Sequence, residues 1–291
     1  MKTVISLPVH EALDTVINQI QNYQHFIPEV IIVIHASSFF EWDDLPEKIE
    51  LQKMDNILIN PDRFPTQRGN GLLVDVHNSN FKFALQNIGF DYFAMHSSND
   101  MFVKKGLENY ITNYEAGFAQ YKLSSIMDFV SKDPILSKKL KAKSNAFDMD
   151  LTKHHPAEKD PCLTEIVKYF NIQEILGSQI EGTFYHTEIF KEIVKEIEKF
   201  YTFKDKRIPA YSREEFYYPT VASKIVNNIG SLYTFFNWKE PIDIDLIENI
   251  RANNQYNYNS TIYDMTNIFN VKRILRNTDD PIRKYITDLS H

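Results

Sequence analysis

Two adjacent glutamates lie within an aromatic segment of the chain. Residues 211–220 read Tyr-Ser-Arg-Glu-Glu-Phe-Tyr-Tyr-Pro-Thr, which places Glu214 and Glu215 between a serine and a group of aromatic side chains. A carboxylate can act as a general base when it is held within hydrogen-bond reach of a hydroxyl group, and surrounding aromatic rings can exclude water. The alternative is a solvated pair in the first turn of a helix, where the helix dipole favours acidic residues. The pattern indicates a candidate catalytic carboxylate in an aromatic-walled site.

Positive charge is concentrated near the C-terminus. Residues 269–276 read Phe-Asn-Val-Lys-Arg-Ile-Leu-Arg, and Arg283 and Lys284 follow. Lysine acts on phosphate oxygens as a point charge and arginine as a bidentate donor, so such a segment could stabilise a phosphate leaving group without a metal ion. The alternative is a solvated basic helix, which could also rest on a membrane surface.

Polar residues follow several apolar runs that read as strands. His10, His35 and His96 lie at such strand ends, and the carboxyl ends of neighbouring parallel strands form the edge where α/β proteins bind ligands. Residues 96–100 read His-Ser-Ser-Asn-Asp, so Ser98 and Asp100 could line a site at this edge. Alternatively, each histidine is hydrogen-bonded within the protein or exposed at its surface. Residue 98 or 99 could also be the N-cap of a helix.

Motifs for common cofactors are missing from the sequence. Neither a P-loop nor a Gly-x-Gly-x-x-Gly motif occurs, and the chain has only 8 glycines. The nearest pattern, Arg68-Gly69-Asn70-Gly71, could let the backbone approach a ligand or could form a turn. The 9 histidines form no His-x-x-x-His pair and no cysteine lies close to them, so we predict no metal site.

Composition limits the possible partners. The chain has 291 residues, 43% of them hydrophobic, and a net charge of −7, which offers no general attraction to nucleic acid or anionic membranes. Cys162 is the single cysteine, which is typical of a reducing compartment. The N-terminal apolar run is too short for a signal peptide, so we expect a cytoplasmic protein.

Hydrophobic periodicity predicts an α/β fold with a central, mostly parallel sheet flanked by helices, in a single domain over residues 1–291. The second apolar run, at residues 30–34, is apolar at every position, as expected for a strand covered on both faces. A polar stretch near residues 138–161 is predicted to be a mobile loop, and residues 269–291 form a basic C-terminal segment. Predicted strands are 4–9, 30–34, 56–60 and 92–96, and predicted helices include 13–20, 71–88, 189–200 and a segment that starts near 215 and continues to 229.

The order of these segments resembles glycosyltransferase family 14, which contains the core-2/I-branching β-N-acetylglucosaminyltransferases and the xylosyltransferases. Residues 212–220 resemble the family pattern Ser-Pro-Asp-Glu-aromatic-x-x-x-Thr, with Glu215 at the catalytic-base position. Residues 269–272 resemble its Phe-Ala-x-Lys segment, with Lys272 at a position that contacts the donor diphosphate. Weaker similarities cover residues 4–10, 33–35, 91–100 and 177–179.

The resemblance implies a GT-A-like fold and an inverting, metal-independent transferase that moves a sugar, preferably GlcNAc, from a UDP-sugar to a hydroxyl of a bacterial surface glycan. A lipid-linked glycan acceptor and an association with the inner face of the membrane are compatible with it. The predicted donor-binding residues are Lys272, Arg273, His10 and Arg68, and the predicted substrate-binding residues are His96, Ser98, Asp100, Ser178, Glu181 and Tyr217. No cofactor beyond the UDP-sugar substrate and no nucleic-acid partner are implied.

Departures from the family pattern leave two alternatives. Arg213 replaces the proline before the acidic pair, Ala36 stands where relatives often have aspartate, and no upstream arginine for the diphosphate can be placed within residues 253–264. A metal-dependent transferase would use Asp100 or another carboxylate to hold Mn²⁺ or Mg²⁺. A glycan-binding or assembly protein would keep the fold without turnover.

Overall fold

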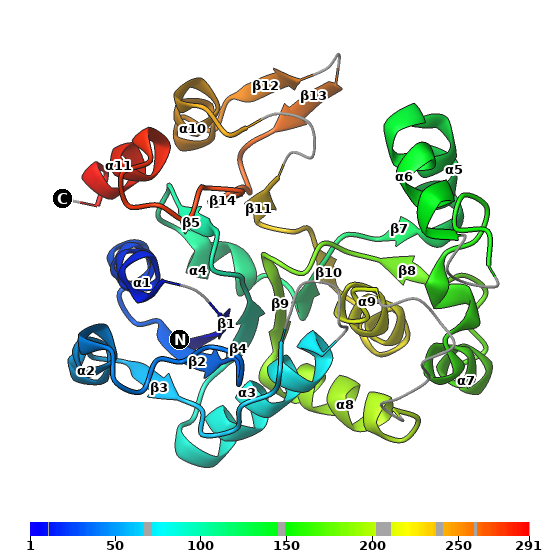
Figure 1. Cartoon of the computed structure of the whole chain (residues 1–291), viewed down its shortest axis with the longest axis horizontal. Helices are drawn as coiled ribbons and strands as arrows, with labels where there is room; N and C mark the ends of the chain where they lie inside the picture. Colours follow the sequence, from blue (N-terminus) through cyan, green and yellow to red (C-terminus); the bar gives the residue numbers. More distant parts are fainter. Residues whose placement is uncertain are drawn as a thin grey trace.

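The central element of the protein is a seven-stranded sheet. A computed structural model describes residues 1–10, 12–66, 72–144, 149–201, 211–236, 241–258 and 261–290. The strands of the sheet are β1 (Thr3–Val9), β2 (Ile31–Ala36), β3 (Ile57–Ile59), β4 (Tyr92–Met95), β6 (Ala116–Gly117), β9 (Thr183–His186) and β10 (Ile229–Gly230). Their order is β10-β6-β9-β4-β1-β2-β3 (Figure 1). Only β9 runs antiparallel to its neighbours, β4 and β6, so the predicted α/β fold with a mostly parallel sheet is confirmed.

Helices cover both faces of this sheet. Those described are α1 (Leu13–Phe26), α2 (Pro46–Lys53), α3 (Leu73–Asn87), α4 (Leu107–Ile111), α5 (Leu123–Lys132), α6 (Pro134–Ser144), α7 (Pro161–Tyr169), α8 (Thr187–Glu198), α9 (Glu214–Ile225), α10 (Ile244–Arg251) and α11 (Pro281–Asp288), with a 3₁₀ helix, η1 (Pro156–Lys159). Helices α1 and α2 lie on one face, and α3 and α8 on the other (Figure 1). Successive residues of β1 and β2 are buried against opposite helix layers, which explains why both strands are buried throughout and mostly apolar.

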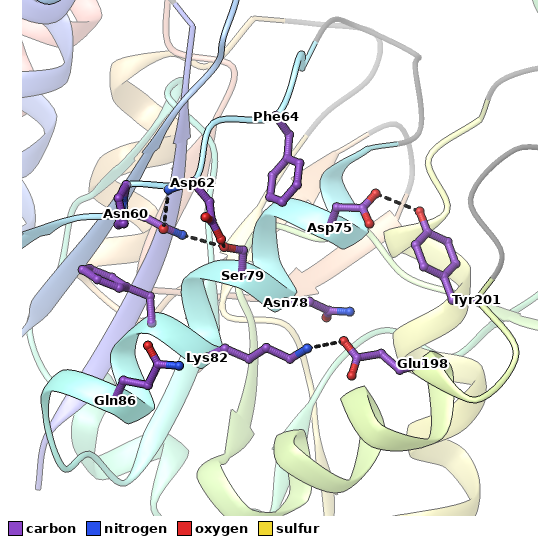
Figure 2. Close-up of a pocket in the computed structure, with 12 residues that line it drawn as sticks. Asn60, Asp62, Phe64, Asp75, Asn78, Ser79, Lys82, Gln86, Glu198 and Tyr201 are labelled. Carbon is purple, nitrogen blue, oxygen red and sulfur yellow. Dashed lines mark hydrogen bonds and ion pairs between the residues drawn. The ribbon is translucent and has the colours of Figure 1, made fainter.

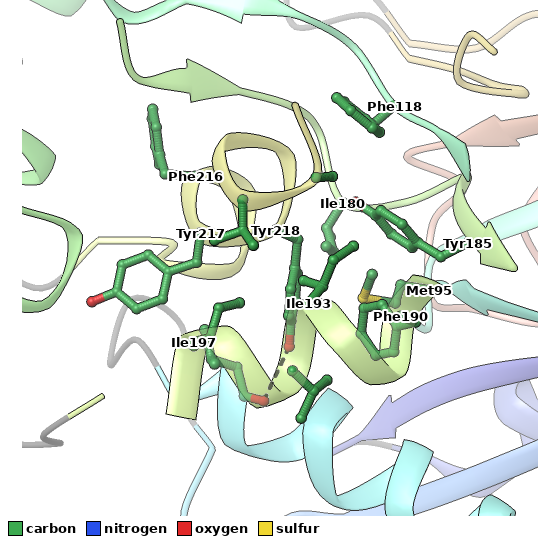
Figure 3. Close-up of a cluster of buried hydrophobic side chains, with 14 of the residues drawn as sticks. Met95, Phe118, Ile180, Tyr185, Phe190, Ile193, Ile197, Phe216, Tyr217 and Tyr218 are labelled. Carbon is green, nitrogen blue, oxygen red and sulfur yellow. Dashed lines mark hydrogen bonds between the residues drawn. The ribbon is translucent and has the colours of Figure 1, made fainter. Parts of the chain in front are cut away.

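A pocket of about 370 Å³ opens over α3, next to the end of α8 (Figure 2). The aromatic residues of α9 belong to the hydrophobic core, with Tyr218 against Phe190 of α8 and Phe216 on another side of the helix (Figure 3). Phe216, Tyr217 and Tyr218 are at most 5% exposed. The expected aromatic wall is therefore a core layer, because three consecutive residues of a helix that is covered on several sides are all buried.

A smaller sheet extends the fold on the C-terminal side. Strand β14 (Asn270–Lys272) lies between β11 (Thr234–Phe235) and β5 (Asp100–Phe102), and Lys272 stands opposite Asp100 in the register. Within residues 253–264, strands β12 (Gln255–Tyr258) and β13 (Thr261–Asp264) pair in antiparallel orientation. Strands β7 (Tyr121–Lys122) and β8 (Leu176–Gly177) form another antiparallel pair.

The polar stretch near 138–161 is largely structured, which corrects the expectation of a mobile loop. Helix α6 continues to Ser144, and η1 leads directly into α7; residues 145–148 lie outside the described ranges. No residue of α6 is buried, so its lysines, leucines and alanine form a helix through backbone propensity and contact with α5. None of the helices in the described ranges combines the length and apolar character needed to span a lipid bilayer.

Candidate active site

Glu215 lies in the first turn of α9, beside the segment that follows β8. The backbone N–H of Ser178 donates to the carbonyl oxygen of Glu215 at 2.8 Å, and Gln179 Nε2 donates to its side-chain Oε1 at 3.2 Å. The side chain is partly buried. These contacts hold the carboxylate in a fixed position rather than leaving it as a solvated first-turn residue.

A chain of polar contacts connects Glu215 to Lys272. The amide of Gln179 that contacts Glu215 also donates to Glu181 Oε2, and Glu181 Oε1 forms an ion pair with Lys272 Nζ. Glu181 is 4% exposed, and the side chain of Lys272 is 14% exposed. The structure thus brings together the three residues predicted separately as base, substrate ligand and diphosphate ligand. Sequence reasoning did not select Gln179, although it belongs to the Gly-Ser-Gln segment already singled out.

Burial and like charges raise the proton affinity of the acidic pair. Burial first, and then the charge of Glu181, raise the pKa of Glu214 to about 7 against the pull of Lys272 and Arg213. Burial, with the charges of Glu214 and Glu181, raises the pKa of Glu215 well above its ordinary value. Oε2 of Glu214 has no hydrogen-bond partner among the described residues. The site therefore holds more carboxylates than the single ammonium group of Lys272 can neutralise.

Replacing Glu214 by Gln is expected to stabilise the protein at pH 8 but not at pH 5. The raised pKa means that protonation of Glu214 stabilises the folded state, fully below pH 4.5 and no longer above about pH 7. A shift from 4.5 to about 7 corresponds to about 3 kcal/mol at most. Thermal melts at both pH values should show a melting temperature several degrees higher for Glu214→Gln at pH 8.

The control for this prediction is Glu188→Gln on α8. The Glu188 side chain is 69% exposed and pairs with Lys191, so its replacement should leave the pH dependence unchanged. An equal effect of Glu214→Gln at both pH values would show that the charge of Glu214 is not the cause.

His96 and Asp100, predicted to contact substrate, lie inside a buried polar network. His96 Nδ1 is 2.8 Å from Asp100 Oδ1, His96 Nε2 is 2.5 Å from the hydroxyl of Tyr233, and the Tyr23 hydroxyl donates to Asp100. Both residues are at most 1% exposed. This corrects the expectation of direct contact, because their polar atoms already bond to one another, to Tyr23 of α1 and to Tyr233, which precedes β11. They position the loop that precedes β5.

Ser98 and Arg273 lie at the junction of this loop with β14. Ser98 is buried, and Arg276 Nε donates to its Oγ at 3.3 Å. Arg273 has φ of +80°, a conformation that non-glycine residues rarely adopt, and its N–H donates to the carbonyl of Asn99 at 2.9 Å. Arg273 thus follows Lys272 directly in a strained turn, a feature that occurs at ligand sites.

Ser178 and Tyr217, both predicted to bind substrate, are also buried. The Ser178 hydroxyl donates to the carbonyl of Gln179 at 2.8 Å and accepts from the N–H of Ala119 at 3.0 Å. The Tyr217 hydroxyl donates to Asp160 at 2.7 Å, away from Glu215. The placement of Tyr217 corrects the prediction, because the aromatic ring is completely covered by its neighbours.

The remaining predicted residues are spread over the protein. His10 is exposed at the end of β1, whereas His35 lies within β2 and is buried, with its Nε2 accepting from the N–H of Phe64 at 2.8 Å. Arg68 lies outside the described residues. Arg283 is 1% exposed and bonds to the carbonyl of Leu275, so it is a core residue rather than part of a basic surface.

No group of three or more His, Cys, Asp or Glu side chains in the described ranges has the geometry to hold a metal ion.

No protein-family model matches the chain, and no curated protein matches it in sequence. Among solved structures, the chain is similar to the galactosyltransferase LgtC in complex with donor and acceptor sugar analogs, with a TM-score of 0.46, 8% identity, and coverage of 100% of this chain and 95% of that chain. It is also similar to an active-site mutant of LgtC, with a TM-score of 0.45, 10% identity and the same coverage.

Proposed function

We propose that the chain is a GT-A-like glycosyltransferase that transfers a sugar from a UDP-sugar to a hydroxyl of a bacterial surface glycan, with inversion and without a metal ion. GlcNAc is the favoured sugar, and Glu215 is the base. The observation that carries the proposal is the contact chain from Glu215 through Gln179 and Glu181 to Lys272. It joins the two motifs whose sequence resembles the base and diphosphate segments of family 14.

In the proposed reaction, Glu215 accepts the proton of the acceptor hydroxyl as its oxygen bonds to the anomeric carbon. The bond from that carbon to the diphosphate oxygen breaks, and UDP leaves with the electron pair. The raised pKa of Glu215 makes it a stronger proton acceptor than an exposed carboxylate. Attack from the face opposite to UDP gives inversion.

Lys272 would stabilise the negative charge that develops on UDP. Its ammonium group pairs with Glu181 in the structure, so a diphosphate would share or replace that contact. The strained backbone at Arg273 would fix the direction of the turn beside the phosphates. Because a departing diphosphate carries more charge than the intact donor, Lys272 would bind it more strongly in the transition state.

UDP is expected to stabilise the protein in the presence of EDTA, and Lys272→Ala should reduce this effect. UDP at about a hundred times its Kd adds about 2.7 kcal/mol, which corresponds to a rise in melting temperature of about 5 °C. Removing a charged phosphate contact should weaken UDP binding by about 10- to 100-fold. Thermal melts at a series of UDP concentrations measure both quantities.

The matched control is Lys284→Ala in the same basic C-terminal segment. Lys284 is exposed and pairs with Asp279, so its replacement should not change the response to UDP. Wild-type protein that does not respond to UDP in EDTA would contradict the proposal. A response only with added Mn²⁺ would favour a metal-dependent transferase.

A further inference from the structure

The pocket over α3 is separate from the residues assigned to the base and the diphosphate. It is formed by the segment after β3, the outer side of α3 and the residues at the end of α8 (Figure 2). Its volume of about 370 Å³ falls within the range of small-molecule sites. The lining residues are Asn60, Pro61, Asp62, Phe64, Asp75, Asn78, Ser79, Lys82, Phe83, Gln86, Glu198 and Tyr201.

Asn78 presents a free hydrogen-bond donor to the pocket. Asn78 is 5% exposed, and its Oδ1 accepts from the hydroxyl of Tyr218 at 2.9 Å. Its amide nitrogen has no hydrogen-bond partner among the described residues. Figure 2 shows this amide between Asp75 and Lys82. Because this nitrogen is not one of the fully buried polar atoms, it is accessible from the pocket and can donate a hydrogen bond to a ligand there.

Acceptors and donors alternate around this amide. The Asp75 carboxylate accepts from the Tyr201 hydroxyl at 2.9 Å, which leaves its other oxygen for a further bond. Lys82 pairs with Glu198 at 2.6 Å across the pocket. Adjacent hydroxyls of a sugar ring both donate and accept, so they match a carboxylate beside an amide and an ammonium group.

The charges and rings of the pocket define the class of ligand further. Asp62, Asp75 and Glu198 outnumber the single cation Lys82 among the lining residues, so an anionic sugar or a phosphate would be repelled. Phe64, Phe83 and Tyr201 add aromatic surface against which the apolar face of a sugar ring can pack. A neutral saccharide satisfies both conditions.

We propose that this pocket is a saccharide subsite that binds a neutral sugar unit of the acceptor glycan away from its reacting end. The role of the pocket in binding the acceptor depends on the proposed function, whereas its ability to bind a neutral sugar does not. Helix α9 connects the two sites, since Glu215 lies in its first turn and the Tyr218 hydroxyl contacts Asn78 at the pocket. A glycan bound there would therefore contact α3, which the bond between Tyr218 and Asn78 joins to the helix that carries the base.

The test is ligand-observed NMR with neutral disaccharides as probes: N,N′-diacetylchitobiose, lactose and xylobiose, with glucuronic acid and spermidine as charged comparisons. At least one disaccharide should bind to the wild type. Asp75→Asn keeps the contact with Tyr201 but removes the charge, and should weaken binding about tenfold. Lys82→Ala, at an exposed position, should also weaken it, whereas Lys191→Ala, which breaks a comparable ion pair on α8, should not.

The outcomes separate this inference from the proposed function. Absence of disaccharide binding, equal binding by all variants, or a preference for glucuronic acid or spermidine would overturn the subsite, even if UDP binding and transfer are confirmed. Disaccharide binding that depends on Asp75 and Lys82 would support the subsite. In that case, absence of a response to UDP would contradict only the transferase.

Discussion

Replacing Glu215 by Gln is expected to lower the rate of sugar transfer at least 100-fold and to leave UDP binding nearly unchanged. General bases contribute about 10²- to 10⁴-fold, and glutamine keeps the size of the side chain and the contact with Gln179 but cannot accept the proton. Because Lys272 rather than Glu215 is assigned to the diphosphate, the loss should appear in kcat.

The measurement is UDP release from UDP-GlcNAc in the presence of a bacterial surface-glycan preparation, over a range of pH. In the wild type the rate should fall as the pH decreases through the raised pKa of Glu215, because a protonated carboxyl cannot act as the base. The variant should lose this pH dependence together with its activity. Glu188→Gln, at an exposed position of α8, serves as the control.

Loss of folding is not expected to account for such a result. Burial disfavours the charged form of Glu215, so the neutral glutamine should be at least as stable at pH 8. A folded Glu215→Gln protein that transfers sugar at the wild-type rate would remove Glu215 from the mechanism, and the neighbouring carboxylate of Glu214 would become the candidate.

The regular elements near the N-terminus could be predicted because local patterns determine them. Strands β1 and β2 are mostly apolar, and α1 has apolar residues at helical spacing. These patterns in residues 4–34 predict strands buried on both faces and a helix buried along one stripe. Helix α6 was missed because nothing in it is buried. Its polar composition favoured the prediction of a loop, although its lysines, leucines and alanine have high helical propensity.

The site was predictable only in part, because polar residues at strand ends have two possible environments. The same pattern that suggested ligand contacts for His96 and Asp100 is satisfied by a buried network with Tyr23 and Tyr233. Whether such residues contact a ligand or form a buried network depends on side chains that are distant in the sequence. The bridge through Gln179 was missed for the same reason, since it depends on three segments that meet only in the folded chain.

Asp160→Ala is expected to destabilise the protein by about 3 to 5 kcal/mol, the largest effect among the stability predictions. Asp160 is 2% exposed, and its carboxylate accepts from Tyr211, Arg213 and Tyr217 at 2.7–2.9 Å. It also caps α7 by accepting from two backbone N–H groups. Removing it would leave the largely buried guanidinium of Arg213 and two tyrosine hydroxyls without this partner.

This contact also gives a physical reason for Arg213 where the family pattern has proline: the ion pair with Asp160 attaches the start of α9 to the start of α7. Urea unfolding tests it against Asp243→Ala, an exposed N-cap of α10 that accepts a single hydrogen bond from Leu246 among the described residues and should cost about 1 kcal/mol. If both variants lose the same stability, Asp160 acts only as a cap. If Asp160→Ala loses 2 kcal/mol or more beyond the control, the buried cluster stabilises the turn that places Glu215, and the variant should also transfer sugar more slowly where it remains folded.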